Sequence, residues 1–381
     1  MKITGIKLSI LESPVGDTIF GLHNVPGMAR IRWTHETAIT RPGFVQALHV
    51  ETDEGIEGLV DMAGTIGDHE GSYLRANLDQ LRALVVGEDP LDRERIWQKL
   101  HQGTRWVYRQ PGWFGTLDNC LWDIAGKAAG MPVYQLLGRV RESIPCYINI
   151  GGATMSEAVA DAERAVDSGF PATKDHFYHD VAENIRWLTA VRETVGENID
   201  CMHDPVGIYT FDEAVRIGRA LEGLHYRWLE EPLPERMHNR MQQLCTALDI
   251  PILAPEMMMN DVDTCAQWLI SGATDLLRVS AVYGTTSVVK LAHLAEMHGT
   301  TVEINGPGGL YGLVHAHLLM AIANTSYYEY FRGGALDESG KEIGLENPVV
   351  PKNGHISAPE GAGWGAEWDF DQFRKKLVTT Y

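Results

Sequence analysis

Polar residues recur at nearly even intervals through the second half of the chain. They follow one another every 24 to 30 residues, and they are Lys174, Asp204, Glu230, Glu256, Ser280, Asn305 and Glu329. Each stands near the end of a short apolar run, and such runs predict buried strands. The carboxyl ends of the strands in a parallel barrel converge on one mouth, so these side chains would face a common site.

Three of these residues are carboxylates on consecutive predicted strands: Asp204, Glu230 and Glu256. In a shared cleft they would repel one another unless a cation joined them. All-oxygen ligation suits Mg²⁺, with Mn²⁺ as the second choice, and the lack of clustered cysteines or an HExxH pair argues against zinc. A single aspartate before a helix is more often a helix cap, but three carboxylates in successive units favour a metal site.

Two candidate bases come from one strand. The alternation of side chains along a strand places Lys174 and His176 on one face and Asp175 on the other. A lysine or histidine beside a divalent cation can remove the proton from the carbon α to a carboxylate, because the metal and nearby donors hold the charge of the resulting enediolate. A lone lysine is more often solvated and a lone histidine more often structural, but the shared face with the metal strands favours a catalytic role for both.

Predicted strands and helices alternate along the part of the chain that carries these residues. Candidate strands cover residues 146–150, 172–176, 199–204, 226–230, 252–256, 276–280, 301–305 and 327–329. The stretches between them have helical spacing and are long enough to cross back over a sheet. The pattern predicts an α/β protein with a (β/α)₈ barrel, and periodicity alone leaves an open doubly wound sheet as the alternative.

The rest of the chain is expected to form a cap on this barrel. Residues 1–130 predict an α+β capping and lid domain, with strands joined by a turn at Asp53-Glu54-Gly55 and helical spacing after residue 78. Residues 131–350 would form the catalytic barrel. Residues 351–381, with Trp364 and Trp368, would return to the cap.

Composition and charge argue against several classes of protein and of site. The net charge of −19 over 381 residues argues against a nucleic-acid binder. No apolar run approaches the roughly 20 residues that cross a bilayer, and Met1 leads directly into a strand-like sequence, so we expect no membrane partner and a cytoplasmic location. The five cysteines are scattered without a CxxC pair, which predicts neither disulfides nor a thiolate zinc site. A homo-oligomer is expected only because such assemblies are common among soluble enzymes.

Three segments resemble a known enzyme family. They are residues 121–127 (LWDIAGK), 132–138 (PVYQLLG) and 228–232 (WLEEP). Together they resemble the mandelate racemase and muconate-lactonizing branch of the enolase superfamily, and the resemblance covers essentially the whole chain. It implies a capped barrel that acts on a small-molecule carboxylate.

The resemblance also implies residue roles. Asp204, Glu230 and Glu256 would be the Mg²⁺ ligands. Glu329 would be the strand-end carboxylate that hydrogen-bonds the substrate carboxylate as the enediolate forms. Both implications are expectations about this chain.

Two departures from the family pattern bear on the reaction. The family usually carries Lys-x-Lys, and this chain has Lys174-Asp175-His176, so the second base would be an imidazole. Asp275 resembles the aspartate of the Asp-His dyad of many members, but Asn305 stands where the histidine would be. Asparagine cannot act as a general base. The dyad is therefore incomplete, which argues against racemisation by two bases on opposite faces.

Proton removal from one face of the substrate remains feasible. His176 could remove the α-proton and then, once protonated, assist the departure of a β-hydroxyl, which is a dehydration. An alignment that brings Arg278 or Glu303 into the site is less favoured, because both lie in the bodies of predicted strands. We therefore expect a Mg²⁺-dependent dehydratase of an acid sugar or a related polyhydroxy carboxylate.

Substrate contacts and rival functions complete the expectations. Residues 16–33 contain Gly21, Pro26 and Gly27, which predicts a lid loop, and His23 within it would contact the substrate together with Asn305. The alternatives are a racemase or epimerase, a lactone cycloisomerase, and a sugar-acid binder that has lost its chemistry.

Overall fold

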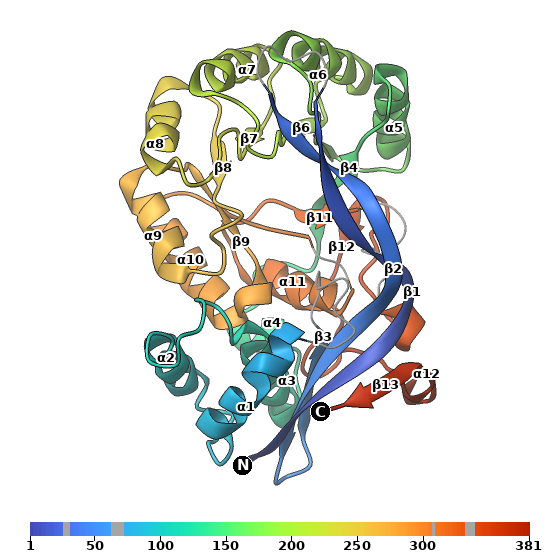
Figure 1. The fold of residues 1–381 in the computed structure, drawn as a ribbon, viewed down its shortest axis with the longest axis vertical. Coiled ribbons are helices and arrows are strands. Elements are labelled where there is room, and N and C mark those ends of the chain that lie inside the picture. Colours follow the sequence, from blue (N-terminus) through green and yellow to red (C-terminus); the bar gives the residue numbers. More distant parts are fainter. Residues whose placement is uncertain (26–30, 62–71, 307–308, 332–339) are drawn as a thin grey trace.

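Eight short parallel strands close into a barrel in this computed structural model, which describes residues 1–25, 31–61, 72–306, 309–331 and 340–381 (Figure 1). The strands are β4 (Ile144–Ile150), β5 (Ala172–Asp175), β6 (Asp200–His203), β7 (Trp228–Glu230), β8 (Ile252–Ala254), β9 (Leu276–Val279), β10 (Val302–Ile304) and β11 (Tyr328–Tyr330). Parallel pairing of β11 with β4 closes the ring. The predicted barrel is confirmed, and an open sheet is excluded.

Helices between the strands surround the barrel (Figure 1). They are α5 (Met155–Asp167), α6 (Val181–Val195), α7 (Phe211–Gly223), α8 (His238–Ala247), α9 (Val262–Ser271), α10 (Thr285–Met297) and α11 (Gly309–Ala321). Helix α7 shows why these segments form helices. Thr210 and Glu213 form a capping box at its start. Its buried residues Ala214, Ile217 and Leu221 follow helical spacing. In the described part of the chain, no helix is long and apolar enough to cross a membrane.

The barrel interior is built in two layers. An apolar cluster fills one end and consists of Tyr147, Ala172, Met202, Trp228, Leu253 and Tyr327. Side chains on a strand return to the same face every second residue. The residues two positions after Ala172, Met202 and Trp228 are therefore also inward-facing, and they are Lys174, Asp204 and Glu230. The apolar layer thus supports a polar layer at the carboxyl ends of the strands.

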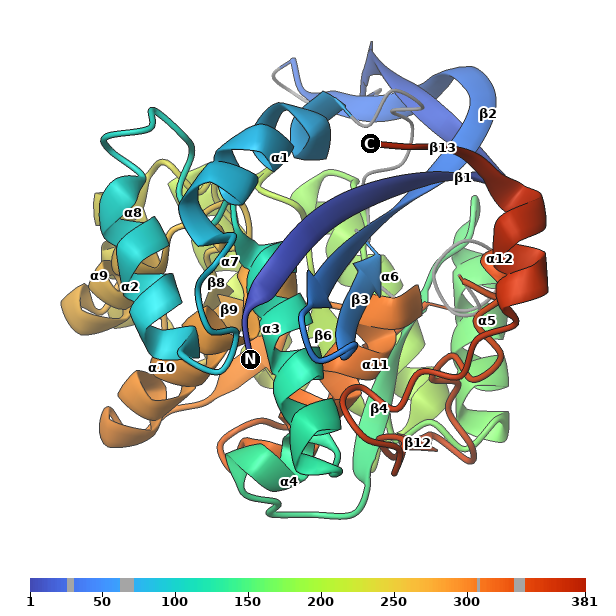
Figure 2. The ribbon, with the colours of Figure 1, turned by 90° about the horizontal axis from the view of Figure 1, so that it is seen from below.

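Both ends of the chain build the cap, as the sequence predicted. Strands β1 (Ile3–Asn24), β2 (Trp33–Thr52) and β3 (Glu57–Asp61) form an antiparallel sheet, and β13 (Leu377–Thr380) joins it beside β1, after helix α12 (Phe370–Lys376) (Figure 2). Four helices follow the sheet, namely α1 (Ser72–Val85), α2 (Arg93–Gly103), α3 (Gly115–Ala129) and α4 (Val133–Leu137). A short strand, β12 (His355–Ile356), pairs antiparallel with β4 and was not predicted.

The segment predicted as a lid loop is largely a strand hairpin. Strand β1 continues to Asn24 and β2 begins at Trp33, so the two strands leave the cap sheet as a long ribbon that runs along the barrel (Figure 1). Pro26 and Gly27 lie outside the described residues. Apolar and β-branched residues such as Ile19, Phe20 and Ile39 favour the extended conformation. Gly21 is accommodated within β1 and does not break it.

Helix α3 ties the cap to the barrel through a fully buried asparagine. The Nδ2 atom of Asn119 donates to the carbonyl of Ala281 at 2.6 Å. Its Oδ1 atom accepts from the backbone N–H of Thr285 at 2.9 Å and from the Thr285 hydroxyl at 2.7 Å. These bonds fix α3 against the start of α10. They also connect to the chain end, because Nε1 of Trp364 donates to the Asn119 carbonyl at 3.0 Å.

We predict that Asn119→Leu lowers the free energy of unfolding by roughly 2–4 kcal/mol, because the substitution leaves buried donors and acceptors without partners. Urea unfolding followed by circular dichroism measures the change. Gln243→Leu, at an exposed position of α8, is the control and should stay within about 0.5 kcal/mol of the wild type. Equal losses in the two variants would contradict the structural role of Asn119.

Candidate active site

The carboxyl ends of the barrel strands open into a cavity of about 270 Å³. This volume lies just below the range of roughly 300–1,000 Å³ that small-molecule sites occupy. Most of the residues expected in the site line the cavity, namely Lys174, His176, Asp204, Glu256, Asn305 and Glu329. Glu230 is fully buried and contacts Lys174. The predicted convergence of distant residues is therefore present.

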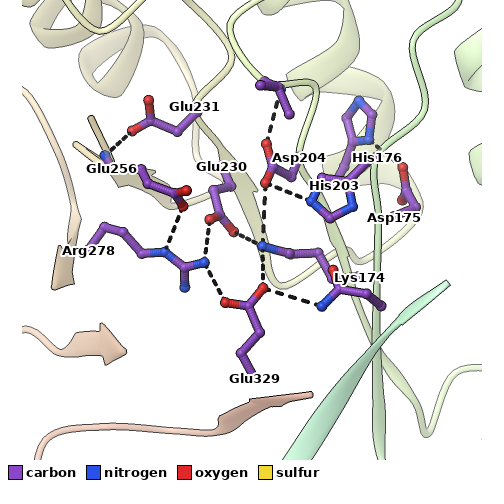
Figure 3. A network of polar contacts seen from close by, with 12 residues as sticks. Lys174, Asp175, His176, His203, Asp204, Glu230, Glu231, Glu256, Arg278 and Glu329 are labelled. Carbon is purple, nitrogen blue, oxygen red and sulfur yellow. Dashed lines mark hydrogen bonds and ion pairs between the residues drawn. The ribbon is translucent and has the colours of Figure 1, made fainter. Parts of the chain in front are cut away.

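Lys174 lies at the centre of the polar layer (Figure 3). Its Nζ atom is 2.8 Å from Oε1 of Glu329 and 3.1 Å from Oε2 of Glu230. Oδ2 of Asp204 is 3.3 Å away. Burial alone would lower the pKa of Lys174, but these carboxylates raise it well above its ordinary value. Lys174 is thus an ammonium that joins carboxylates from three strands.

Arg278 is a second buried cation in the site, and its low weight in the sequence interpretation was wrong. Its Nη2 atom lies 2.7 Å from Oε2 of Glu329 and 3.0 Å from Oε1 of Glu230. Its Nε atom is 3.3 Å from Oε2 of Glu256. Arg278 does lie within the body of β9, but on a strand this short the residue still faces the barrel axis. Its long side chain then reaches the polar layer (Figure 3).

His176 and Asp204 form the opposite side of the site. Nε2 of His176 is 3.2 Å from Oδ2 of Asp204, and the imidazole is 27% exposed toward the cavity. Burial opposes protonation of His176, but Asp204 outweighs it and raises its pKa. Burial also opposes the charge of Asp204, yet Lys174 and His176 hold the pKa of Asp204 below its ordinary value. The neighbouring phenol of Tyr178 stays neutral, because burial raises its pKa to about 12.

Glu329 is an ionised acceptor in this arrangement. Besides the two cations, the backbone N–H of Gly306 donates to its Oε2 at 2.8 Å, and Nδ2 of Asn149 donates to its Oε1 at 3.3 Å. Although burial opposes its charge, Arg278 and Lys174 keep the pKa of Glu329 below its ordinary value. The resemblance implies a hydrogen bond between Glu329 and the substrate carboxylate, and Glu329 would first have to take up a proton to donate it.

The strand face opposite Lys174 holds a separate pair. Nδ1 of His203 lies 2.7 Å from Oδ1 of Asp175, and Nε2 of His203 is 3.1 Å from the hydroxyl of Tyr209. Both His203 and Asp175 point away from the cavity, as strand alternation predicts.

The carboxylates fit a divalent cation in chemistry and in charge. Among the described residues, Asp204, Glu230, Glu256 and Glu329 contact the buried cations Lys174 and Arg278, and His176 contacts Asp204, so these four carboxylates outnumber the positive groups that face them. Burial raises the pKa of Glu230 to about 7 even though Arg278 and Lys174 act to lower it. Its Oε1 atom also lacks an aligned hydrogen bond. Within the described ranges, however, no three His, Cys, Asp or Glu side chains already stand around one point as a metal cluster. Metal binding therefore requires these side chains to converge.

His23 does not line the cavity. Its Nδ1 atom lies 3.7 Å from Oε2 of Glu36, and the residue pairs with Thr34 across the hairpin. The histidine of the hairpin that does line the cavity is His35, which follows Thr34 on β2 and pairs with Leu22. The hairpin therefore brings a histidine to the site, but from its second strand. Sequence patterns could not select it, because the register of the hairpin determines which of these residues faces the barrel.

The placement of Asp275 corrects the alignment of the dyad. Asp275 precedes β9, and its Oδ2 accepts from the backbone N–H of Ile252 at 2.9 Å, at the start of β8. It therefore lies at the amino end of the barrel, away from the cavity. At the carboxyl end of β9 stands Ser280, whose Oγ accepts from the N–H of Val282 at 3.3 Å. Among the described residues that line the cavity, neither β9 nor β10 contributes a second carboxylate or histidine.

Comparison with known protein families agrees with this geometry. The enolase C-terminal domain-like family matches residues 157–372, and the mandelate racemase / muconate lactonizing enzyme N-terminal domain family matches residues 30–138. The chain belongs to the mandelate racemase and muconate lactonizing enzyme branch of the enolase superfamily. The resemblance found in the sequence is thereby confirmed.

Relatives within the superfamily cover most of the chain. A D-galactonate dehydratase family member of Catenulispora acidiphila is 27% identical over 367 residues, which is 87% of this chain and 85% of the relative. The L-talarate/galactarate dehydratase of Salmonella typhimurium is 28% identical over 347 residues, which is 87% of this chain and 81% of the relative. The crystal structure of D-glucarate dehydratase from Agrobacterium tumefaciens complexed with magnesium superimposes with a TM-score of 0.83 at 27% identity, and the match covers both chains completely.

We predict that Lys174→Met lowers the free energy of unfolding by about 3–5 kcal/mol in EDTA, because removing one partner leaves buried carboxylates uncompensated. Urea unfolding measures the loss. Lys290→Met removes an ion pair with Glu94 at the surface and should change stability by less than about 1 kcal/mol. If Lys174→Met were as stable as the control, the ammonium would not be what compensates these carboxylates.

Proposed function

We propose that this protein is a Mg²⁺-dependent dehydratase of an acid sugar or a related polyhydroxy carboxylate. The observation that carries the proposal is the one-sided arrangement of the cavity. His176 stands beside Lys174 and Asp204, while Asn305 and Arg278 take the places where a second base could act. An arrangement with one base favours elimination over inversion at the α-carbon.

The reaction uses His176 twice. The imidazole removes the proton from the carbon α to the substrate carboxylate, and the electron pair of that C–H bond forms a double bond to the β-carbon. The C–O bond at the β-carbon breaks, and protonated His176 returns its proton so that the hydroxyl leaves as water. The enol product tautomerises to a 2-keto-3-deoxy acid. Histidine suits both steps, because its imidazole gains and loses a proton near neutral pH.

Asp204, Glu230 and Glu256 would hold the Mg²⁺. When bound, the ion supplies positive charge beside the substrate carboxylate and so makes the α-proton more acidic. Lys174 adds a buried, permanently charged donor at the same place. The convergence of four carboxylates on fewer positive groups among the described residues supports this assignment.

Other cavity residues suit a chain of hydroxyl groups. Tyr178 is a neutral donor, and Asn305 and His35 offer both donors and acceptors. Glu231 and Glu235 also line the cavity and can accept hydrogen bonds from hydroxyls. Burial raises the pKa of Glu231 well above its ordinary value, which favours the protonated carboxyl, a form that can also donate.

The names of the relatives agree with this substrate class. The two curated relatives are a D-galactonate dehydratase family member and an L-talarate/galactarate dehydratase, and the solved D-glucarate dehydratase contains magnesium. Each of these names refers to a sugar-derived carboxylate. They support dehydration over the isomerase alternatives.

A library of acid sugars, incubated with the protein and Mg²⁺ in D₂O, tests the function. We expect at least one member to release a 2-keto-3-deoxy acid, measured by a colorimetric keto-acid assay and by NMR. Exchange of the α-proton without keto acid would favour an epimerase or cycloisomerase. Thermal stabilisation by several members without any turnover would favour a binding protein.

His176→Asn should reduce α-proton exchange and keto-acid release by at least about 100-fold, because asparagine cannot accept the proton. NMR in D₂O measures the exchange, and calorimetry should show Mg²⁺ binding retained. The control is His179→Asn, which changes a histidine of the same loop. The ring centroid of His179 lies 4.3 Å from that of Trp187, and His179 does not line the cavity. Exchange at the wild-type rate in His176→Asn would reject His176 as the base.

A further inference from the structure

Arg278 contacts two of the three candidate Mg²⁺ ligands. Figure 3 shows its guanidinium between Glu230, Glu256 and Glu329. The side chain is 1% exposed, and its Nε and Nη2 atoms lie 3.3 Å from Oε2 of Glu256 and 3.0 Å from Oε1 of Glu230. Its Nη1 atom donates to the hydroxyl of Tyr147 at 3.2 Å, and this bond holds the guanidinium in the barrel.

A divalent cation would need the same carboxylate oxygens. Mg²⁺ binds oxygen ligands at about 2.0–2.1 Å, so Glu230 and Glu256 would both have to turn toward one point. A guanidinium between them prevents that convergence, and it also repels a second cation in a site with little solvent screening.

Arg278 and Lys174 differ in whether they contact Glu256. Among the ion pairs of the described residues, the one with Arg278 is the only one that reaches Glu256. Lys174 contacts Asp204, Glu230 and Glu329, so it leaves Glu256 free. Glu256 is also the most exposed of these carboxylates, with 36% of its side chain accessible, and it can therefore turn with the least rearrangement.

We propose that Arg278 is a built-in competitor of the metal and sets the Mg²⁺ affinity of this protein. The guanidinium neutralises Glu230 and Glu256 until a divalent cation displaces it from Glu256, while its contacts with Glu329 and Tyr147 retain it in the site. The net free energy of metal binding is then the free energy gained from the contacts of Mg²⁺ minus the free energy needed to break the ion pair between Arg278 and Glu256. The inference rests on the ligand set of the proposed function.

Arg278→Met tests the competition, because methionine fills similar space without charge. Titration of the full-length protein with MgCl₂ in a calorimeter, without substrate, should give a Kd at least about tenfold lower than that of the wild type. In EDTA the variant should melt at a lower temperature than the wild type, and saturating Mg²⁺ should raise its Tm by more. An unchanged or weaker affinity would overturn the proposal.

The control for charge removal is Arg227→Met. Arg227 pairs with Asp200 at the other end of the barrel, where its Nη1 atom lies 2.8 Å from Oδ2 of Asp200. Because neither residue lines the cavity, the Mg²⁺ affinity of this variant should equal that of the wild type. Tighter binding in Arg227→Met as well would mean that net charge, and not the contacts of Arg278, explains the result.

A measurement on the wild type decides the question even if Arg278→Met does not fold. The Nε–H signals of ¹⁵N-labelled arginine are recorded by NMR during MgCl₂ titration, and Arg278→Lys identifies the signal of Arg278 by its loss. We expect this signal to shift as Mg²⁺ saturates the site, since the Nε contact with Glu256 is broken. A signal that does not move at saturation would contradict displacement.

Failure of this inference and failure of the proposed metal site give different results. If the wild type does not bind Mg²⁺, or if Glu230→Gln binds it as tightly as the wild type, the ligand set itself is wrong. If Glu230→Gln weakens binding and Arg278→Met fails to tighten it, the ligand set stands and only the role of Arg278 is rejected. Glu303→Gln, at a buried glutamate on β10 that accepts from the hydroxyl of Thr301, is the matched control for Glu230→Gln.

Discussion

The buried carboxylates at the mouth of the barrel must be compensated by positive charge or hydrogen bonds. A charged carboxylate away from water is strongly unfavourable unless cations or hydrogen bonds replace the water. The barrel brings Asp204, Glu230 and Glu329 to one mouth, and Lys174 contacts all three. Arg278 provides the second charge, but two cations are fewer than the carboxylates that surround them. The divalent cation of the proposed function would compensate the remaining negative charge.

The layers of the barrel support this arrangement. The apolar cluster around Tyr147, Met202 and Trp228 closes the amino end and excludes water from below the polar layer. Electrostatic contacts above it are therefore stronger than they would be in solvent. The cap adds the other boundary, since α3 is hydrogen-bonded to the barrel through Asn119 and the β1–β2 hairpin supplies His35 to the cavity. Cap and barrel thus share in one site.

Much of the fold and of the candidate site could be predicted from the sequence. The spacing of the apolar runs and the alternation of side chains along each strand point to the same residues. The spacing of short apolar runs indicated all eight barrel strands, and strand alternation placed Lys174 and His176 together. Arg278 was given too little weight, because the sequence does not show that a long side chain in a short strand can reach the mouth. Asp275 was assigned from similarity, but hydrogen bonding to Ile252 places it at the amino end of the barrel. The choice between His23 and His35 depends on hairpin register, which requires the three-dimensional pairing.

We propose that carboxylates from three strands bind one divalent cation in competition with an internal arginine. The decisive experiment is a crystal structure of the protein grown with saturating Mn²⁺, with anomalous scattering measured at the manganese edge. We expect one strong peak ligated by Asp204, Glu230 and Glu256, with the guanidinium of Arg278 withdrawn from Glu256. If the mouth shows no peak and Arg278 still bridges Glu230 and Glu256, both the metal site and the competition are rejected.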